Sequence, residues 1–173
     1  MPPLNGQTAC PKTIVLSAAA AAPTNPNPAD FPPAPPLPTT VSPNFGFSTP
    51  NTHLRHTFSF PAPCREGNCC EIQKATLELQ IKALQGGQSH QSSDAGNDKW
   101  YIYKNGTLLA SGYLWNSFPV ASGQTQTLTI PMQPAWLNGC RLSFTTQDDT
   151  SVMAAKLTVT GCCVRPNMSA TTP

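Results

Sequence analysis

Residues 75–83, ATLELQIKA, decide the fold class because their apolar side chains recur at every second position. A β-strand puts such alternating residues on two opposite faces, whereas a helix scatters them around its surface. The stretch therefore predicts a strand with one face against a core and one face toward solvent. The expected inward residues are Ala75, Leu77, Leu79, Ile81 and Ala83, and the expected outward ones are Thr76, Glu78, Gln80 and Lys82.

Further period-2 segments lie on both sides of this strand. Asn105-Gly106 separates two of them and is typical of a two-residue hairpin turn, because both central residues of a type I′ turn need positive φ. The predicted strands are residues 56–60 (HTFSF), 100–104 (WYIYK), 107–115 (TLLASGYLW), 126–130 (QTLTI), 141–146 (RLSFTT) and 154–160 (AAKLTVT). With no long amphipathic helix among them, about seven or eight strands predict an all-β fold, an antiparallel β-sandwich of jelly-roll-like topology.

The composition changes near residue 50, since 13 of the 20 prolines lie in residues 1–50. Proline lacks the N–H that a sheet interior needs, so this part favours extended polyproline II chain. We expect three parts: an extended Pro-rich arm (1–53), a β-sandwich domain (54–164) and a C-terminal tail (165–173).

A proline-rich arm cannot bury enough of its own surface to offset the entropy of ordering its backbone. If ordered, it must lie on its own domain or on a neighbouring subunit; a linker is the alternative. Residues 13–22, TIVLSAAAAA, also resemble the apolar part of a secretory signal, although the preceding residues hold one charge and three prolines.

Charge excludes some partners. Ten Lys and Arg against eight Asp and Glu give a net charge of +2, and 10% of residues are charged. Nucleic-acid binding without sequence preference needs several basic residues on one face, and none are clustered here. No apolar run reaches the roughly 18 residues of a membrane span. We expect neither nucleic acid nor a membrane as a partner.

Seven cysteines leave three interpretations open. Cys64, Cys69 and Cys70 precede the best strand, and Cys162 and Cys163 follow the last. If these strands are antiparallel neighbours, the two groups approach each other, and a disulfide there would close a loop of about 93 residues and contribute on the order of 4 kcal/mol. Free buried thiols and a zinc site are the alternatives, although the usual C-x₂-C spacing is absent.

An odd number of cysteines leaves at least one thiol over. Cys10 on the arm and Cys140 are the candidates for a bond between chains. A lone unreactive thiol is the alternative for Cys10.

Two acidic loops are candidates for Ca²⁺, which takes oxygen ligands. They contain Asp94 and Asp98 in SSDAGNDKW and Asp148 and Asp149 in TQDDTS. The stronger interpretation is that these residues cap turns through nearby N–H groups, so we expect no obligatory cofactor.

The large amphipathic aromatic residues predict either core and subunit-interface packing or a sugar-stacking platform. Alternation in WYIYK places successive aromatics on opposite faces, one in the core and one outside. The interface candidates are Trp100, Tyr101, Tyr103, Tyr113, Trp115 and Trp136.

No catalytic motif is present. HExxH, GxSxG, a P-loop and GxGxxG are all missing, and no Cys or Ser arrangement near His53, His56 or His90 indicates a base. We do not expect an enzyme.

Residues 69–163 resemble bacterial and tailed-phage β-sandwich accessory modules, such as phage capsid decoration or cement proteins. The similarity lies in CCEIQKATLELQIKAL, NDKWYIYKNG and LSFTTQDDTSVMAAKLTVTGCC. It implies a jelly-roll-like structural virion protein, without catalytic residues, that grips neighbouring subunits with an extended arm and tolerates disulfides. Its partners would be capsid or tail subunits, or copies of itself, in an extracellular particle. The alternative is a secreted bacterial surface binding module or adhesin, for instance one that recognises carbohydrate.

Overall fold

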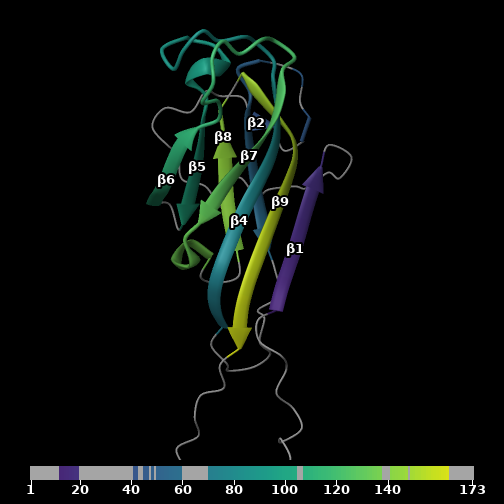
Figure 1. Cartoon of the computed structure of the whole chain (residues 1–173), viewed down its shortest axis with the longest axis vertical. Helices are drawn as coiled ribbons and strands as arrows, with labels where there is room; N and C mark the ends of the chain where they lie inside the picture. The colour runs from purple at the N-terminus through teal and green to yellow at the C-terminus, as the bar shows by residue number, and fades with distance from the viewer. Residues whose placement is uncertain are drawn as a thin grey trace, which may run out of the picture.

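The computed structural model describes residues 12–19, 41–42, 45–46, 48, 50–59, 70–104, 107–137, 141–147 and 149–163, which form a two-layer β-sandwich (Figure 1). The predicted all-β sandwich is thereby confirmed, and the described residues contain no α-helix. The strands are β1 (Lys12–Ala19), β2 (Val41–Ser42), β3 (His53–Ser59), β4 (Cys70–Ala83), β5 (Lys99–Lys104), β6 (Thr107–Tyr113), β7 (Thr125–Met132), β8 (Arg141–Thr146) and β9 (Thr150–Cys163). Two short 3₁₀ helices, η2 (Ala95–Asn97) and η3 (Pro134–Leu137), lie in the connections.

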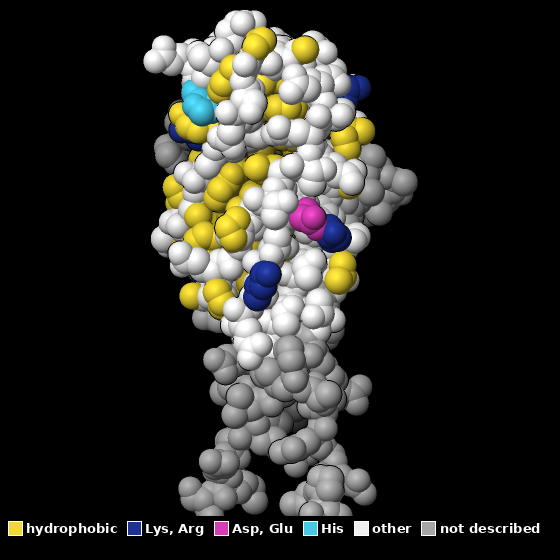
Figure 2. Space-filling model, viewed as in Figure 1, with side chains coloured by type: hydrophobic (Ala, Val, Ile, Leu, Met, Phe, Trp, Pro, Cys, Tyr) yellow, Lys and Arg dark blue, Asp and Glu magenta, His cyan; other side chains and the backbone are white. Residues whose placement is uncertain are grey.

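One layer is a four-stranded antiparallel sheet in the order β1-β9-β4-β7. The two longest strands, β4 and β9, lie side by side at its centre and pair from Cys70↔Cys163 to Ala83↔Thr150. On its outer face, Lys156 forms an ion pair with Glu78. Figure 2 shows this side of the molecule, with a magenta acidic and a dark-blue basic side chain next to each other on it.

The second layer is a five-stranded sheet in the order β2-β3-β8-β5-β6. All its pairings are antiparallel except that of the two-residue β2, which runs parallel to β3. β5 and β6 form the predicted hairpin, with one register shift after Ile102; residues 105 and 106 lie outside the described part.

The core lies between the two sheets and contains the alternating residues that the sequence assigns to it. All five inward residues of the 75–83 stretch are buried, and the outward ones are exposed or half-buried. The facing sheet contributes Leu54, His56 and Phe58 from β3, Ile102 from β5, and Leu142 and Phe144 from β8, while β9 adds Val152, Ala155, Leu157 and Val159. Complete burial of a Leu or Ile side chain stabilises the fold by about 1.5–3 kcal/mol relative to exposure.

The first strand comes from the segment that the sequence predicts to be an extended arm. β1 pairs with β9 through all eight of its residues, from Lys12↔Gly161 to Ala19↔Ala154. β1 therefore completes the four-stranded sheet as its edge strand, beside β9 in Figure 1. Residues 1–11, 20–40 and 164–173, which hold most of the predicted arm and the whole predicted tail, lie outside the described residues.

Candidate functional site

A polar pocket lies on the outer face of the five-stranded sheet, at the end where β5 begins and β6 and β8 end. Its volume is about 290 Å³. Alternation directs the outward residues of β5 and β6 into it, because Lys99, Tyr101 and Tyr113 share the face opposite the buried Ile102. The β4–β5 loop and the residue after β8 complete the lining, which consists of His90, Ser93, Asn97, Lys99, Tyr101, Tyr113 and Gln147.

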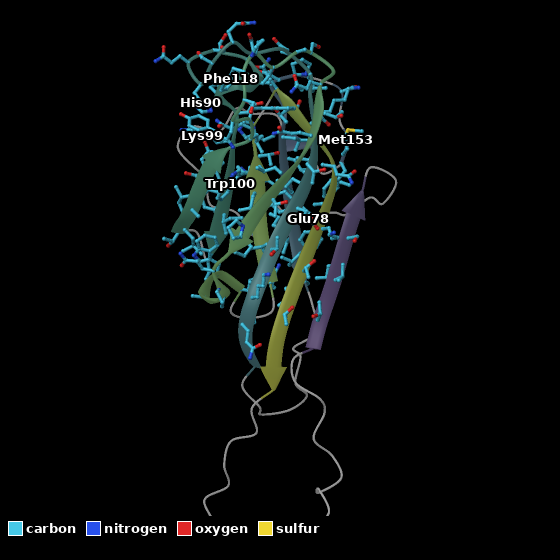
Figure 3. The ribbon with its side chains drawn as sticks, viewed as in Figure 1. Glu78, His90, Lys99, Trp100, Phe118 and Met153 are labelled. Atoms are coloured by element: carbon cyan, nitrogen blue, oxygen red, sulfur yellow. The ribbon has the colours of Figure 1, made fainter. Side chains whose placement is uncertain are left out.

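Tyr113 stands at the centre of the pocket's ring contacts. The His90 ring stacks on it with centroids 3.6 Å apart and an interplanar angle of 9°. The Lys99 ammonium lies over the same Tyr113 ring, 4.9 Å from its centroid, within the range of a cation–π interaction. Figure 3 shows His90 and Lys99 close together at this end of the sheet.

Hydrogen bonds fix the orientation of two further pocket residues. His90 Nε2 lies 2.8 Å from the Trp115 carbonyl oxygen, and because a carbonyl only accepts, Nε2 carries the hydrogen. The Tyr101 hydroxyl donates to Gln147 Oε1 at 2.9 Å. This contact leaves the Gln147 amide nitrogen, a donor, as the end of that side chain that can meet a ligand.

The β4–β5 loop that supplies His90, Ser93 and Asn97 is held together by local hydrogen bonds. Ser92 Oγ accepts from the backbone N–H of Gln88 and of Ser89, at 2.9 and 3.1 Å. A Cβ at Gly96 would lie 2.1 Å from the Ser89 carbonyl oxygen, so the loop closes this tightly only with glycine there.

A second candidate surface is the edge of the four-stranded sheet formed by β1. Thr13 and Thr160 lie directly opposite each other, and their hydroxyl oxygens are 3.0 Å apart. Leu16 packs against the core, while Val15 leaves 56% of its surface exposed. Edge strands present unpaired backbone groups to which another chain can add.

The six predicted interface aromatics divide into three groups. Tyr101, Tyr103 and Tyr113 lie half-buried on the outer face of the five-stranded sheet. Trp100 and Trp136 are partly buried against the core. Trp115 is completely buried and donates its indole N–H to Thr150 Oγ1 at 2.7 Å, so it is a core residue and not a surface one.

Trp100 also explains a glycine in the neighbouring strand. It pairs with Gly112 of β6, where a Cβ would lie 2.7 Å from the indole ring. The ring therefore packs across the position of a missing side chain, and Figure 3 labels it below Lys99.

Two of the four predicted calcium ligands lie close together, and the carboxylate of each accepts hydrogen bonds from N–H groups. Asp98 and Asp149 are both buried, and Asp98 Oδ2 accepts from the backbone N–H of Asp149 at 3.1 Å. Asp149 Oδ1 accepts from the N–H of Asn51 and from Gln85 Nε2. Asp94 is half-buried beside η2, and Asp148 lies outside the described residues. Within the described ranges, no three His, Cys, Asp or Glu side chains are grouped as metal ligands would be.

The other two histidines, His53 and His56, are buried away from the pocket that contains His90. His53 is buried at the start of β3. His56 is buried among Phe45, Phe58 and Phe144, each in an edge-to-face contact, and burial lowers its pKa to about 4. His56 is therefore neutral at physiological pH and packs as an aromatic core residue.

The cysteine predictions concern residues that are only partly described. Cys70 and Cys163 are directly opposite in the β4–β9 register, and Cys162 is opposite Glu71. The two strands are thus the antiparallel neighbours that the disulfide prediction requires. Cys10, Cys64, Cys69 and Cys140 lie outside the described residues. The disulfide itself stays a prediction.

Four pocket residues were not predicted as binding residues: Ser93, Asn97, Gln147, and His90, which the sequence analysis considers only as a possible base. They come from two loops that the sheet brings together, and no spacing in the chain relates them. Only the outward position of Tyr101 on the predicted strand 100–104 could have indicated this surface.

Comparison of the chain with protein-family models, curated proteins and solved structures finds no match. In the part of the chain that the structure describes, no helix has the length and apolar character needed to cross a bilayer.

Proposed function

We propose that this chain is a structural protein of a larger assembly, of the kind that decorates or cements a phage capsid or tail, and that its first strand is exchanged between copies. In this proposal, the sandwich sits on the assembly and residues 12–19 of one copy pair with β9 of a neighbour. The pairing of β1 with β9, across 147 residues of sequence, is the observation that carries the proposal.

The strand order supports an assembly role. If β1 and β3–β9 are taken as the eight strands of a jelly roll, the orders β1-β9-β4-β7 and β3-β8-β5-β6 match its two four-stranded sheets. Jelly rolls serve as capsid and lectin domains, among others. A fold does not determine a function, so the argument depends on the edge strand.

The connection to β1 permits exchange. Twenty-one residues, 20–40, separate Ala19 from Val41, and a chain of that length spans at most about 70 Å when fully extended. The hydrogen bonds of β1 with β9 are the same whether the strand comes from its own chain or from another copy. Exchange of an identical element is a low-cost route to assembly, and many linked contacts raise the effective concentration of each.

Paired cysteine substitutions test the exchange. Thr13→Cys in one copy and Thr160→Cys in another are opposite only if β1 crosses between chains. We expect co-expression of the two variants, followed by mild oxidation, to give a heterodimer linked between positions 13 and 160. Wild-type protein and each single variant, oxidised in the same way, show which disulfides the native cysteines form by themselves. If the mixture contains no such link while the Thr13→Cys/Thr160→Cys double variant closes it within one chain, exchange is excluded.

The alternative is a secreted bacterial surface binding module, which the polar pocket favours. That role requires an exported chain whose mature N-terminus follows the 13–22 stretch. N-terminal sequencing of native protein separates the two, because cleavage after residue 22 would remove β1 and with it the strand that the exchange needs.

A further inference from the structure

We infer that the polar pocket formed by the β4–β5 loop, β5, β6 and Gln147 binds a carboxylated sugar, such as a uronic or sialic acid unit of a glycan. This inference is independent of the assembly role, because the pocket lies on the outer face of the sheet opposite to the one that β1 completes.

The lining matches a ligand rich in hydroxyl groups. Ser93 and the tyrosines contribute hydroxyls, and Asn97 and Gln147 contribute amides that both donate and accept. Sugar hydroxyls also both donate and accept, so they can pair with such groups. Most small-molecule pockets are lined mainly by apolar side chains, which this one is not.

The positive charge in the lining favours a ligand that carries a carboxylate. Lys99 contributes a full positive charge, and no carboxylate is among the described lining residues. Within the described part of the chain, no ion pair is formed by Lys99, while the nearby Asp98 carboxylate is turned inward to the Asp149 N–H. A ligand carboxylate beside Lys99 would form a charge-assisted hydrogen bond.

The tyrosines do not form an open stacking platform. His90 already stacks on Tyr113 at 3.6 Å, and the Lys99 ammonium lies over the same ring. Tyr101 holds Gln147 through its hydroxyl. These contacts fix the polar groups in place before a ligand arrives, which reduces the entropy lost on binding.

The size of the pocket limits the ligand. A volume of about 290 Å³ is at the lower end of known ligand sites, so one sugar unit fits and a long segment does not. For a single sugar unit in this pocket we expect a dissociation constant of roughly 1 mM.

The test uses amide chemical shifts of the full-length protein during titration with two matched sugars. Methyl glucuronide and methyl glucoside differ only in carrying a carboxylate or a hydroxymethyl group. We expect saturable shifts of residues around Lys99 with the glucuronide, and binding at least about tenfold weaker with the glucoside. Lys99→Gln should weaken glucuronide binding by about tenfold, whereas Lys82→Gln, an exposed lysine on the other sheet, should leave it unchanged.

Sialic acid methyl glycoside, acetate and inorganic phosphate complete the set of probes. Saturable binding of the sialoside at the same residues would extend the support to a second carboxylated sugar. The inference is overturned if neither acidic sugar binds, if the glucoside binds as tightly as the glucuronide, if acetate or phosphate binds as tightly as the sugars, or if Lys99→Gln changes nothing while its amide spectrum shows an intact fold.

Discussion

Thr13 and Thr160 lie directly opposite each other on β1 and β9, with their hydroxyl oxygens 3.0 Å apart. This contact joins the start of the chain to its last described strand. It places β1, a segment flanked by prolines and far from β9 in the sequence, at the edge of the four-stranded sheet. The assembly proposal requires that β9 can pair with the β1 strand of another copy as well as with its own.

Leu16 tests how β1 is held. It packs against the core, whereas the adjacent Val15 faces solvent. We expect Leu16→Asp to release β1 and lower the free energy of unfolding by about 1–3 kcal/mol, because a carboxylate replaces a partly buried apolar group. Val15→Asp is the matched control and should stay within about 0.5 kcal/mol of wild type. Chemical denaturation measures both, and equal effects would contradict the described orientation of β1.

His56 should make the stability of the sandwich depend on pH. Its pKa is about 4 in the folded state and 6.5 when unperturbed, so the unfolded chain binds the proton first as pH falls. Above pH 6.5 His56 is neutral in both the folded and the unfolded chain, and its titration costs no folding stability. Folding stability declines by up to about 1.4 kcal/mol per pH unit between pH 6.5 and 4.

His56→Phe is the control for this effect, since a phenyl ring can occupy the place between Phe45, Phe58 and Phe144. Urea unfolding of both proteins across this pH range gives the two slopes. The difference between them should vanish above pH 6.5. Identical slopes throughout would show that His56 is not buried as described.

Gly96 should be required for the pocket. Alanine there would bring its Cβ to 2.1 Å from the Ser89 carbonyl oxygen, which belongs to the backbone and cannot rotate away. We expect Gly96→Ala to destabilise the fold by about 1–3 kcal/mol and to shift the amide signals of the β4–β5 loop. Gln91→Ala, on the exposed part of the same loop, should leave the stability unchanged and shift only the amide signals next to residue 91. A Gly96→Ala protein with wild-type stability would contradict the close approach.

Cys70 and Cys163 should form a disulfide in oxidised protein. They are directly opposite on paired antiparallel strands, and the bond would close a loop of 93 residues (163 − 70). We expect peptide mapping under non-reducing conditions to recover the 70–163 link. Replacing both residues with Ser should lower the free energy of unfolding by about 4.6 kcal/mol in the chain-entropy model. Recovery of free thiols at both positions from oxidised protein would disprove the pairing.

The sequence was most informative where one strand contacts both core and solvent. The alternation of residues 75–83 predicts each buried position of that part of β4, and Asn105-Gly106 predicts the β5–β6 hairpin. The alternation of side chains along a strand and the geometry of a turn are local properties, which is why a short window of sequence is enough to reveal them.

The same sequence did not reveal β1 or the pocket. TIVLS is flanked by alanines and prolines, and its role depends on pairing with β9, 147 residues away at Thr13 and Thr160. The pocket joins Lys99 to His90 and Gln147 from separate loops. Both are products of the sheet topology, which strand alternation alone does not specify.

Strand exchange is the central claim, and a disulfide from position 13 of a Thr13→Cys chain to position 160 of a Thr160→Cys chain measures it most directly. For this measurement the two variants are expressed separately, one of them isotope-labelled, and are unfolded and refolded together. The linked peptides are identified by mass spectrometry. Val15→Cys with Thr160→Cys, two residues out of register, is the control that should not link. The account predicts a labelled–unlabelled 13–160 peptide pair in the mixed sample. Finding that bond only within single Thr13→Cys/Thr160→Cys chains, and never between chains, would contradict it.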